Sequence, residues 1–271
     1  MEHSDYPVKV PLITDVLARA IHDEMTRSER KRFAFPTRFR HSDAGKCERY
    51  LWYEAKGFEQ SNPPDVGSAY IMWLGTMLHE ELQRALPERY PGAQIETPVR
   101  IDDLSSGHLD AIVRLPDGRK VCYELKTRGS FGYDKAVGWK RKNWAVDTPQ
   151  GPSTSDRIQG ALNASAIDAD LLVIGLLSLE AASKGFADKH GIDDIGRICA
   201  EWHFTPAEFG PWAADEITRM RTMDAALDAG LKLPRIAIGD EMVPVKLNPN
   251  NNTPPWQCTY CSHFDTCKGD E

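Results

Sequence analysis

Hydrophobic and polar residues follow two different periods along this chain. Alternating or β-branched runs, typical of strands, cover 95–101, 109–115, 120–126 and 196–205, and a continuous apolar run at 171–179 predicts a buried strand. Spacing typical of helices covers 13–25, 43–56, 68–86, 156–166 and 207–229. The order of these elements predicts an α/β protein whose central mixed sheet of about five strands is flanked by helices.

Two of the predicted strands form a hairpin in the middle of the chain. The sequence Pro116-Asp117-Gly118 between them is a turn signal, because proline sets the first turn dihedral and glycine accepts a left-handed one. A three-residue loop of this kind makes Leu115 and Arg119 the flanking pair. Counting back along both strands then places Asp110 opposite Glu124, with both side chains on one face.

Strand alternation places Lys126 on the same face as Glu124, whereas the other face of this strand is apolar and is expected to be buried. Two carboxylates and a lysine on one patch are suited to a metal-dependent phosphodiesterase. The carboxylates can hold a hard cation, and the lysine can orient or deprotonate the attacking water. A solvated strand face with a Glu–Lys ion pair is the alternative, and these three residues alone do not exclude it.

Two predicted helices carry further polar candidates. The helix over 68–86 has an apolar stripe that includes His79, in the sequence G-T-M-L-H-E, and a histidine there is either a core residue or a metal ligand. The helix over 156–166 carries Gln159 and Asn163 one turn apart on the same side.

Two segments are rich in basic side chains and could contact a nucleic acid. Aromatic and basic residues interleave over 128–144, which suits a groove for single-stranded nucleic acid or a loop whose aromatic rings pack on the core. The basic run over 27–40 is either a phosphate contact or a solvated linker.

Composition restricts the class of protein. The 271 residues carry a formal net charge of −7, which lowers the expectation of binding nucleic acid by bulk electrostatics but leaves room for a nuclease with a local metal site. The chain begins without a basic, apolar leader, and its longest apolar run is too short to cross a bilayer, so no membrane partner is expected. With six cysteines and no secretory signal, we expect a cytoplasmic protein, of cellular or phage origin, in a reducing compartment.

The last residues contain a metal-binding pattern. In C-T-Y-C-S-H-F-D-T-C the thiols of Cys258, Cys261 and Cys267 can be aimed at one centre. A fourth ligand would come from Cys47 or from His263. The spacing is compatible with a structural zinc ion or with an iron–sulfur cluster.

These motifs occur in an order that resembles a known family. G-T-M-L-H-E, G-H-L-D, E-L-K-T, a helix with a glutamine, and one early plus three late cysteines are arranged as in RecB-like nucleases of the PD-(D/E)xK superfamily. More narrowly, the chain resembles the branch with an iron–sulfur cluster, which includes the CRISPR-adaptation exonucleases, their stand-alone phage relatives and the nuclease domain of AddB. The match spans about Cys47 to Cys267.

The resemblance implies a role for each matching residue. His79, Asp110, Glu124 and the backbone carbonyl of Leu125 would ligate Mg²⁺ or Mn²⁺, and Lys126 would be the catalytic lysine. Gln159 would support the site from its helix. The ligands of a [4Fe–4S] cluster would be Cys47, Cys258, Cys261 and Cys267.

Two positions depart from the family pattern. Leu109 precedes Asp110, as is common in this branch. Asn163 stands where the family usually has tyrosine, a departure expected to affect how the helix contacts DNA rather than the metal site.

We therefore expect a restriction-endonuclease-like fold with a helical iron–sulfur lobe made from both chain ends. Residues 1–90 would form an N-terminal helical region with the first cluster cysteine, 91–230 the nuclease core, and 231–271 the cysteine-rich segment. The expected function is metal-dependent exonucleolytic hydrolysis of DNA, with a preference for single-stranded ends. The alternatives are a DNA-binding or scaffold subunit that works with a recombination or integrase partner, and a zinc-stabilised endonuclease.

Overall fold

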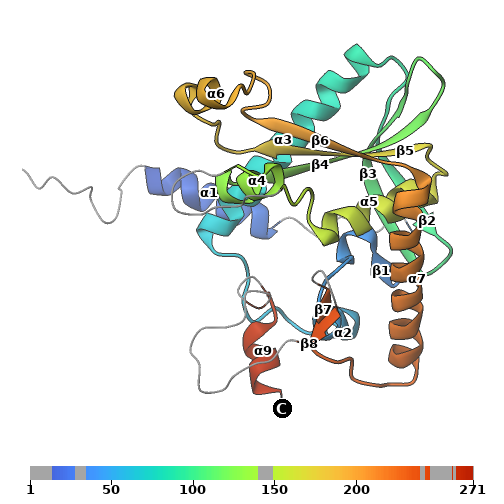
Figure 1. Ribbon diagram of the computed structural model, residues 1–271. Coiled ribbons are helices and arrows are strands. Elements are labelled where there is room, and N and C mark those ends of the chain that lie inside the picture. Colours follow the sequence, from blue (N-terminus) through green and yellow to red (C-terminus); the bar gives the residue numbers. More distant parts are fainter. Residues whose placement is uncertain are drawn as a thin grey trace, which may run out of the picture.

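A six-stranded mixed sheet lies at the centre of the protein (Figure 1). The structure is a computed structural model that describes residues 14–27, 35–139, 149–238, 242–244, 258 and 261–270. The strands are β1 (Phe39–Arg40), β2 (Gln94–Ile101), β3 (Ser105–Arg114), β4 (Lys120–Arg128), β5 (Leu171–Ser178) and β6 (Cys199–Phe204). Their order is β1-β3-β4-β5-β6, and β2 also pairs with β3. The expected mixed sheet is therefore confirmed, with one strand more than the pattern predicted.

The central hairpin has the register that its turn predicts. β3 and β4 are antiparallel, with Arg114 opposite Lys120 and Ala111 opposite Tyr123. The Leu115 N–H donates to the Arg119 carbonyl at 3.0 Å, so these two residues flank the loop as expected. β5 then runs parallel to β4, which requires a crossover, and the helix α5 (Thr154–Ala166) lies within that connection.

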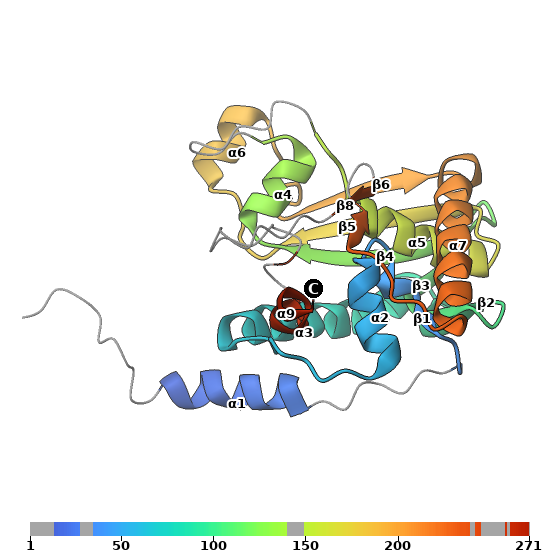
Figure 2. The same ribbon diagram turned by 90° about the horizontal axis from the view of Figure 1, so that it is seen from below.

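Helices cover both faces of the sheet (Figure 2). α5 and α7 (Pro206–Asp228) pack over the largest apolar cluster, which contains Leu172 and Ile174 of β5. The end of α3 (Val66–Arg89) packs against the neighbouring positions Leu171 and Val173 on the opposite face. Because β5 is covered on both sides, it reads as a continuous apolar run in the sequence.

The remaining elements surround this core. They are α1 (Thr14–Arg27), the 3-10 turn η1 (His41–Asp43), α2 (Glu48–Lys56), α4 (Ser130–Val137), α6 (Lys184–His190), β7 (Ile236–Ile238), β8 (Met242–Pro244) and α9 (Phe264–Gly269). No helix in the described ranges has both the length and the apolar character needed to cross a membrane.

Two expectations about helices were wrong. The helix predicted from residue 43 begins only at Glu48, because the chain first makes η1 and then passes through Gly45 at a φ of 74°. Ile71, which helical spacing places on the same apolar stripe as His79 and so on the face expected to be buried, is 51% exposed. The helix meets the sheet from the next turn on, where Gly75 lies against Thr127 of β4, and further along Leu86 packs against the second apolar cluster.

The C-terminal segment packs against α2, close to the beginning of the chain. The Tyr53 hydroxyl donates to Asp270 at 2.6 Å, and the Asn62 N–H donates to the Ser262 carbonyl at 2.9 Å. His263 is fully buried and its Nε2 lies 2.9 Å from an oxygen of Glu54. Chain segments separated by about 200 residues therefore form one lobe, whereas the division into three sequence regions stays a prediction.

Candidate active site

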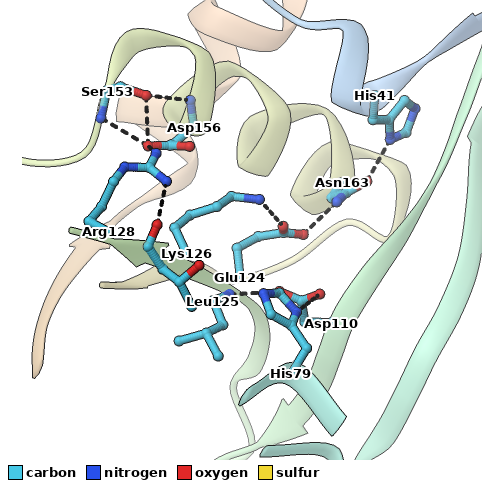
Figure 3. A network of polar contacts seen from close by, with 11 residues as sticks. His41, His79, Asp110, Glu124, Leu125, Lys126, Arg128, Ser153, Asp156 and Asn163 are labelled. Carbon is cyan, nitrogen blue, oxygen red and sulfur yellow. Dashed lines mark hydrogen bonds and ion pairs between the residues drawn. The ribbon is translucent and has the colours of Figure 1, made fainter. Parts of the chain in front are cut away.

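The candidate carboxylates lie where β3 and β4 begin to separate (Figure 3). The paired register of the two strands ends at Ala111 and Tyr123, one residue before Asp110 and Glu124. An Asp110 oxygen accepts the Leu125 N–H at 2.7 Å. Beyond the end of the paired register, the Asp110 side chain accepts the hydrogen bond of a β4 backbone N–H. This bond holds the carboxylate in place.

His79 reaches the same carboxylate from α3. Its Nδ1 lies 3.2 Å from the other oxygen of Asp110. The hydrogen bond to Asp110 raises the pKa of His79 against the opposing effect of burial. The interpretation of His79 as a core residue is therefore wrong, since it faces a carboxylate rather than the apolar core, and its role as a metal ligand stays a prediction.

Glu124 and Lys126 form a buried ion pair. Glu124 is 1% exposed, and the lysine Nζ lies 3.3 Å from Glu124 Oε2. Burial raises the pKa of Glu124 to about 7, with Asp110 adding to the rise and Lys126 opposing it. Burial lowers the pKa of Lys126, but Glu124, Asp110 and Asp156 outweigh it and raise the pKa. The alternative of a solvated strand face is therefore wrong: Glu124 is buried, Lys126 is only 15% exposed, and each charge of the pair stabilises the other.

The other Glu124 oxygen is held by α5. Asn163 Nδ2 donates to Glu124 Oε1 at 2.5 Å, and Asn163 Oδ1 lies 2.6 Å from Nδ1 of His41. Both Asn163 and His41 are fully buried. The departure at Asn163 therefore lies in the interior beside Glu124, so the expectation that it affects a DNA contact of the helix rather than this site is wrong.

A second polar contact joins the end of β4 to the start of α5. Arg128 donates to Asp156 and, at 2.9 Å, to the Thr127 carbonyl. Asp156 also accepts from Ser153 at the N-terminus of α5. Gln159 is half-buried on the same helix, one turn before Asn163. The hydrogen bonds that connect α5 to the hairpin carboxylates run through Asn163, so the supporting role of Gln159 stays a prediction.

Sequence reasoning did not identify His41 or the contact of Asn163 with Glu124. His41 lies in a short turn, 122 positions before its partner, and no local pattern marks it. The glycine of G-H-L-D was a usable signal, because Gly107 lies directly against the His41 side chain.

Solved structures were compared with this fold. SSO0001 matches with a TM-score of 0.50 at 17% identity, over 96% of this chain and 98% of that chain. The two folds are similar. An alkaline exonuclease from Laribacter hongkongensis matches at a TM-score of 0.41 and 11% identity, over 72% of this chain and 94% of that chain. A phage related exonuclease from Haemophilus somnus 129PT matches at 0.35 and 14%, over 80% and 84% of the two chains.

No protein-family model matches the chain, and no curated protein matches its sequence. At such low identities the function has to be argued from the site itself.

The four cysteines of the candidate cluster come together in the C-terminal lobe. Burial is the main cause that raises the pKa of Cys258 to about 11, and the thiols of Cys261, Cys47 and Cys267 contribute to the rise. Arg235 Nε donates to Cys267 Sγ at 3.2 Å. Of the two candidates for the fourth ligand, Cys47 thus lies within electrostatic reach of the other thiols, whereas Nε2 of His263 contacts Glu54.

Neither the hairpin carboxylates with His79 nor the four cysteines are arranged in this structure as a complete set of ligands around one ion. Among the residues that the structure describes, no three histidine, cysteine or acidic side chains are arranged tightly enough to hold a single metal ion. At the hairpin, His79 and Asp110 hydrogen-bond to each other, so metal binding there would exchange this contact for ligation.

The structure describes part of each of the two segments that were predicted to contact nucleic acid. In the aromatic segment, Tyr133 is fully buried and its ring contacts Trp139, so these two rings pack on the core, whereas Phe131 is 55% exposed. In the basic run, Arg38 pairs with Asp224 and Asp228 of α7. The predicted cations at 31, 32 and 140–142 and the aromatic ring at 144 lie outside the described residues.

Proposed function

We propose that this protein is a metal-dependent deoxyribonuclease whose active site is formed by His79, Asp110, Glu124 and Lys126. The observation that carries the proposal is the convergence of these four side chains at the point where β3 and β4 separate. Desolvating the two charges of the Glu124–Lys126 pair opposes folding, so the pair is weak as a stabilising device. A catalytic role gives a reason for its presence in the interior.

The donor set fits a hard divalent cation. Carboxylate oxygens of Asp110 and Glu124 and the carbonyl of Leu125 are oxygen ligands of the type that Mg²⁺ and Mn²⁺ take, and the imidazole of His79 adds a nitrogen. Such an ion, when bound, polarises the phosphoryl group and acidifies water. Lys126 would hold the attacking water and stabilise the negative charge that develops on the phosphate oxygens.

An exonuclease that prefers single-stranded ends is the form of this activity that we favour. The N-terminal half of α3 leads to the site: Gly75 lies against Thr127, the residue after Lys126. This half carries the exposed Tyr70, Ile71 and Met72. Apolar and aromatic surfaces beside a phosphodiesterase centre suit unpaired bases, because each base can stack regardless of its sequence.

A [4Fe–4S] cluster on Cys47, Cys258, Cys261 and Cys267 is the cofactor that we propose for the C-terminal lobe. The four thiols influence one another electrostatically, yet they are not packed as ligands of one ion. The order of the four cysteines along the chain, which resembles that of the iron–sulfur branch, is what supports the cluster over zinc.

The decisive experiment is digestion of single-stranded DNA labelled at one end, in Mg²⁺ or Mn²⁺. We expect the wild type to degrade the strand. Asp110→Ala, Glu124→Ala and Lys126→Ala should each reduce the rate by a factor of at least about 100, because a metal ligand or a charge-stabilising group is lost. Glu88→Ala, an exposed glutamate on α3, is the matched control and should cut normally.

The same experiment tests the alternative. If the wild type binds DNA but cuts it in neither metal, the site assignment fails and a binding subunit of a recombination or integrase complex becomes the better explanation. Duplex and single-stranded substrates run side by side measure the strand preference.

A further inference from the structure

A chain of three buried side chains leads from the N-terminal part of the protein to the candidate active site. His41 Nδ1 contacts Asn163 Oδ1 at 2.6 Å, and Asn163 Nδ2 contacts Glu124 Oε1 at 2.5 Å (Figure 3). All three residues are at most 1% exposed. The contacts join η1, α5 and β4, three elements that are not neighbours in the sequence.

The chemistry of the three groups determines the direction of each hydrogen bond. A glutamate oxygen is an acceptor, so the amide NH₂ of Asn163 must face Glu124, since its carbonyl oxygen there would meet another acceptor. The carbonyl oxygen of Asn163 then faces His41, whose Nδ1 must carry the proton and donate it. Burial lowers the pKa of His41, which favours the neutral ring that this arrangement needs.

The close approach of His41 depends on a glycine in the catalytic motif. A Cβ at position 107 would lie 2.9 Å from the His41 Cβ and 3.0 Å from its Nδ1. These distances leave no room for a side chain, and a larger residue would push the imidazole away from Asn163. Gly107 therefore belongs to the same arrangement as His41, although it touches none of the carboxylates.

The two oxygens of Glu124 are held by different donors. Asn163 holds Oε1, and Lys126 holds Oε2 at 3.3 Å. Since a carboxylate held at both oxygens has a defined orientation, loss of either donor would let it rotate. Without a donor on its other side, the Asn163 amide would be held only by the carboxylate that it is meant to position, and its own orientation would be less defined.

We propose that His41 is a positioning residue for the metal site, which orients the Asn163 amide and through it the Glu124 carboxylate. This inference rests on the proposed function, since it assigns the orientation of a metal ligand. Asn163 stands in place of the family's tyrosine, and in this chain the position forms the link between His41 and Glu124 rather than a contact with DNA.

The test measures Mn²⁺ affinity by electron paramagnetic resonance, without substrate. His41→Leu removes the donor and should raise the Mn²⁺ dissociation constant about 10- to 100-fold, the effect typical of losing a group that orients a ligand. His41→Asn places an amide N–H near the position of the ring Nδ1 and should restore most of the affinity. In an Asn163→Leu background, His41→Leu should have no further effect, because the link is already broken.

A matched control separates positioning from general destabilisation. Met220 is fully buried in α7, in the main apolar cluster, and does not belong to the chain of contacts. Met220→Ala should lower the melting temperature but leave the Mn²⁺ dissociation constant unchanged. If Met220→Ala and His41→Leu weaken Mn²⁺ binding equally, the effect of His41 is merely structural and the inference is overturned.

Two further outcomes would also overturn it. Wild-type affinity in His41→Leu, or an undiminished effect of His41→Leu in the Asn163→Leu background, would show that His41 does not act through Asn163. Glu124→Ala identifies a failure of the proposed function: if it binds Mn²⁺ as tightly as the wild type, the metal site is wrong and the inference falls with it.

Discussion

At the scale of single residues, the candidate site depends on burial that is balanced by specific donors. Glu124 is almost fully buried, and an isolated carboxylate in such a place would be strongly destabilising. Asn163 and Lys126 compensate by holding one oxygen each. The residue that contacts Asn163 from its other side carries an unfavourable term. His41 has a neutral, buried ring, and its Nε2 has no hydrogen-bond partner within the described part of the chain.

His41 makes the stability depend on pH. Because burial lowers its folded-state pKa below the usual value, the unfolded chain binds the proton first as the pH falls. We expect the free energy of unfolding to decrease below a pH of about 6.5, by up to about 1.4 kcal/mol per pH unit until the folded-state pKa is passed. Urea unfolding of the wild type and of His41→Asn at pH 7.5 and 5.5 (roughly one unit on either side of the unfolded-state pKa) measures this. A decrease of the same size in both proteins would contradict the prediction.

At the scale of elements, the hairpin and its neighbour β5 are held by close packing across the sheet. Gly175 of β5 pairs with Leu125 of β4, next to Tyr123. A Cβ at Gly175 would lie 3.0 Å from the Cζ atom of the Tyr123 ring and closer still to its hydroxyl oxygen. Because an aromatic ring on a central strand cannot bend away, the absence of a side chain at position 175 is required for the two strands to pair at this point.

Gly175→Ala should therefore destabilise the protein by about 1–3 kcal/mol, the typical cost of overpacking a core. The measurement is the free energy of unfolding in urea. Gly185→Ala on α6 is the matched control, because a Cβ there meets nothing within 4 Å, and it should be neutral or slightly stabilising. Adding Tyr123→Leu should recover part of the loss, and a Gly175→Ala variant as stable as the wild type would refute the packing argument.

At the scale of the whole molecule, α7 connects the sheet to the lobe that contains the cysteines. Arg219 of α7 donates to Glu216 at 2.8 Å and lies 3.5 Å from Glu48, the first residue of α2. All three side chains are at most 10% exposed. Since Cys47 directly precedes Glu48, this buried network fixes the position of Cys47, the first cysteine of the proposed cluster, relative to the core.

Arg219→Leu leaves two buried carboxylates without a counter-charge and should cost about 3–5 kcal/mol in unfolding free energy. Arg38→Leu is the control, because Arg38 also pairs with α7, through Asp224 and Asp228, but its side chain is 38% exposed. A loss of only about 0–1 kcal/mol is expected there. Equal losses in the two variants would show that burial does not decide the energy of these pairs.

The proposed cluster should contribute to folding of the same lobe. Cys261→Ala removes one ligand, so we expect purified protein that has lost the brown iron–sulfur absorbance and melts at a lower temperature, because ligation stabilises the folded form. Cys199→Ala, a cysteine of β6 away from the lobe, should keep both colour and melting temperature. Zinc in place of iron, found by metal analysis of colourless wild-type protein, would contradict the cluster assignment.

The sequence by itself determined most of the elements of the core and which residues of the candidate site lie on one hairpin. Strand alternation, the Pro-Asp-Gly turn and helical spacing depend on interactions between near neighbours, and they predicted the β3–β4 register, the buried strand β5 and the helices α5 and α7. The register in turn placed Asp110, Glu124 and Lys126 near one another, because pairing along a hairpin follows from its turn.

Only the tertiary structure decided what surrounds these residues. The contact of His41 with Asn163 and the packing of α2 against the C-terminal segment join positions more than 100 residues apart. The burial of Glu124 depends on the packing of α5, from which Asn163 donates to it across 39 positions. No periodicity encodes such contacts, since they depend on how completed elements pack together. The aromatic segment illustrates the same limit: its spacing allowed either stacking on bases or packing on the core, and the fold buried Tyr133 while leaving Phe131 exposed.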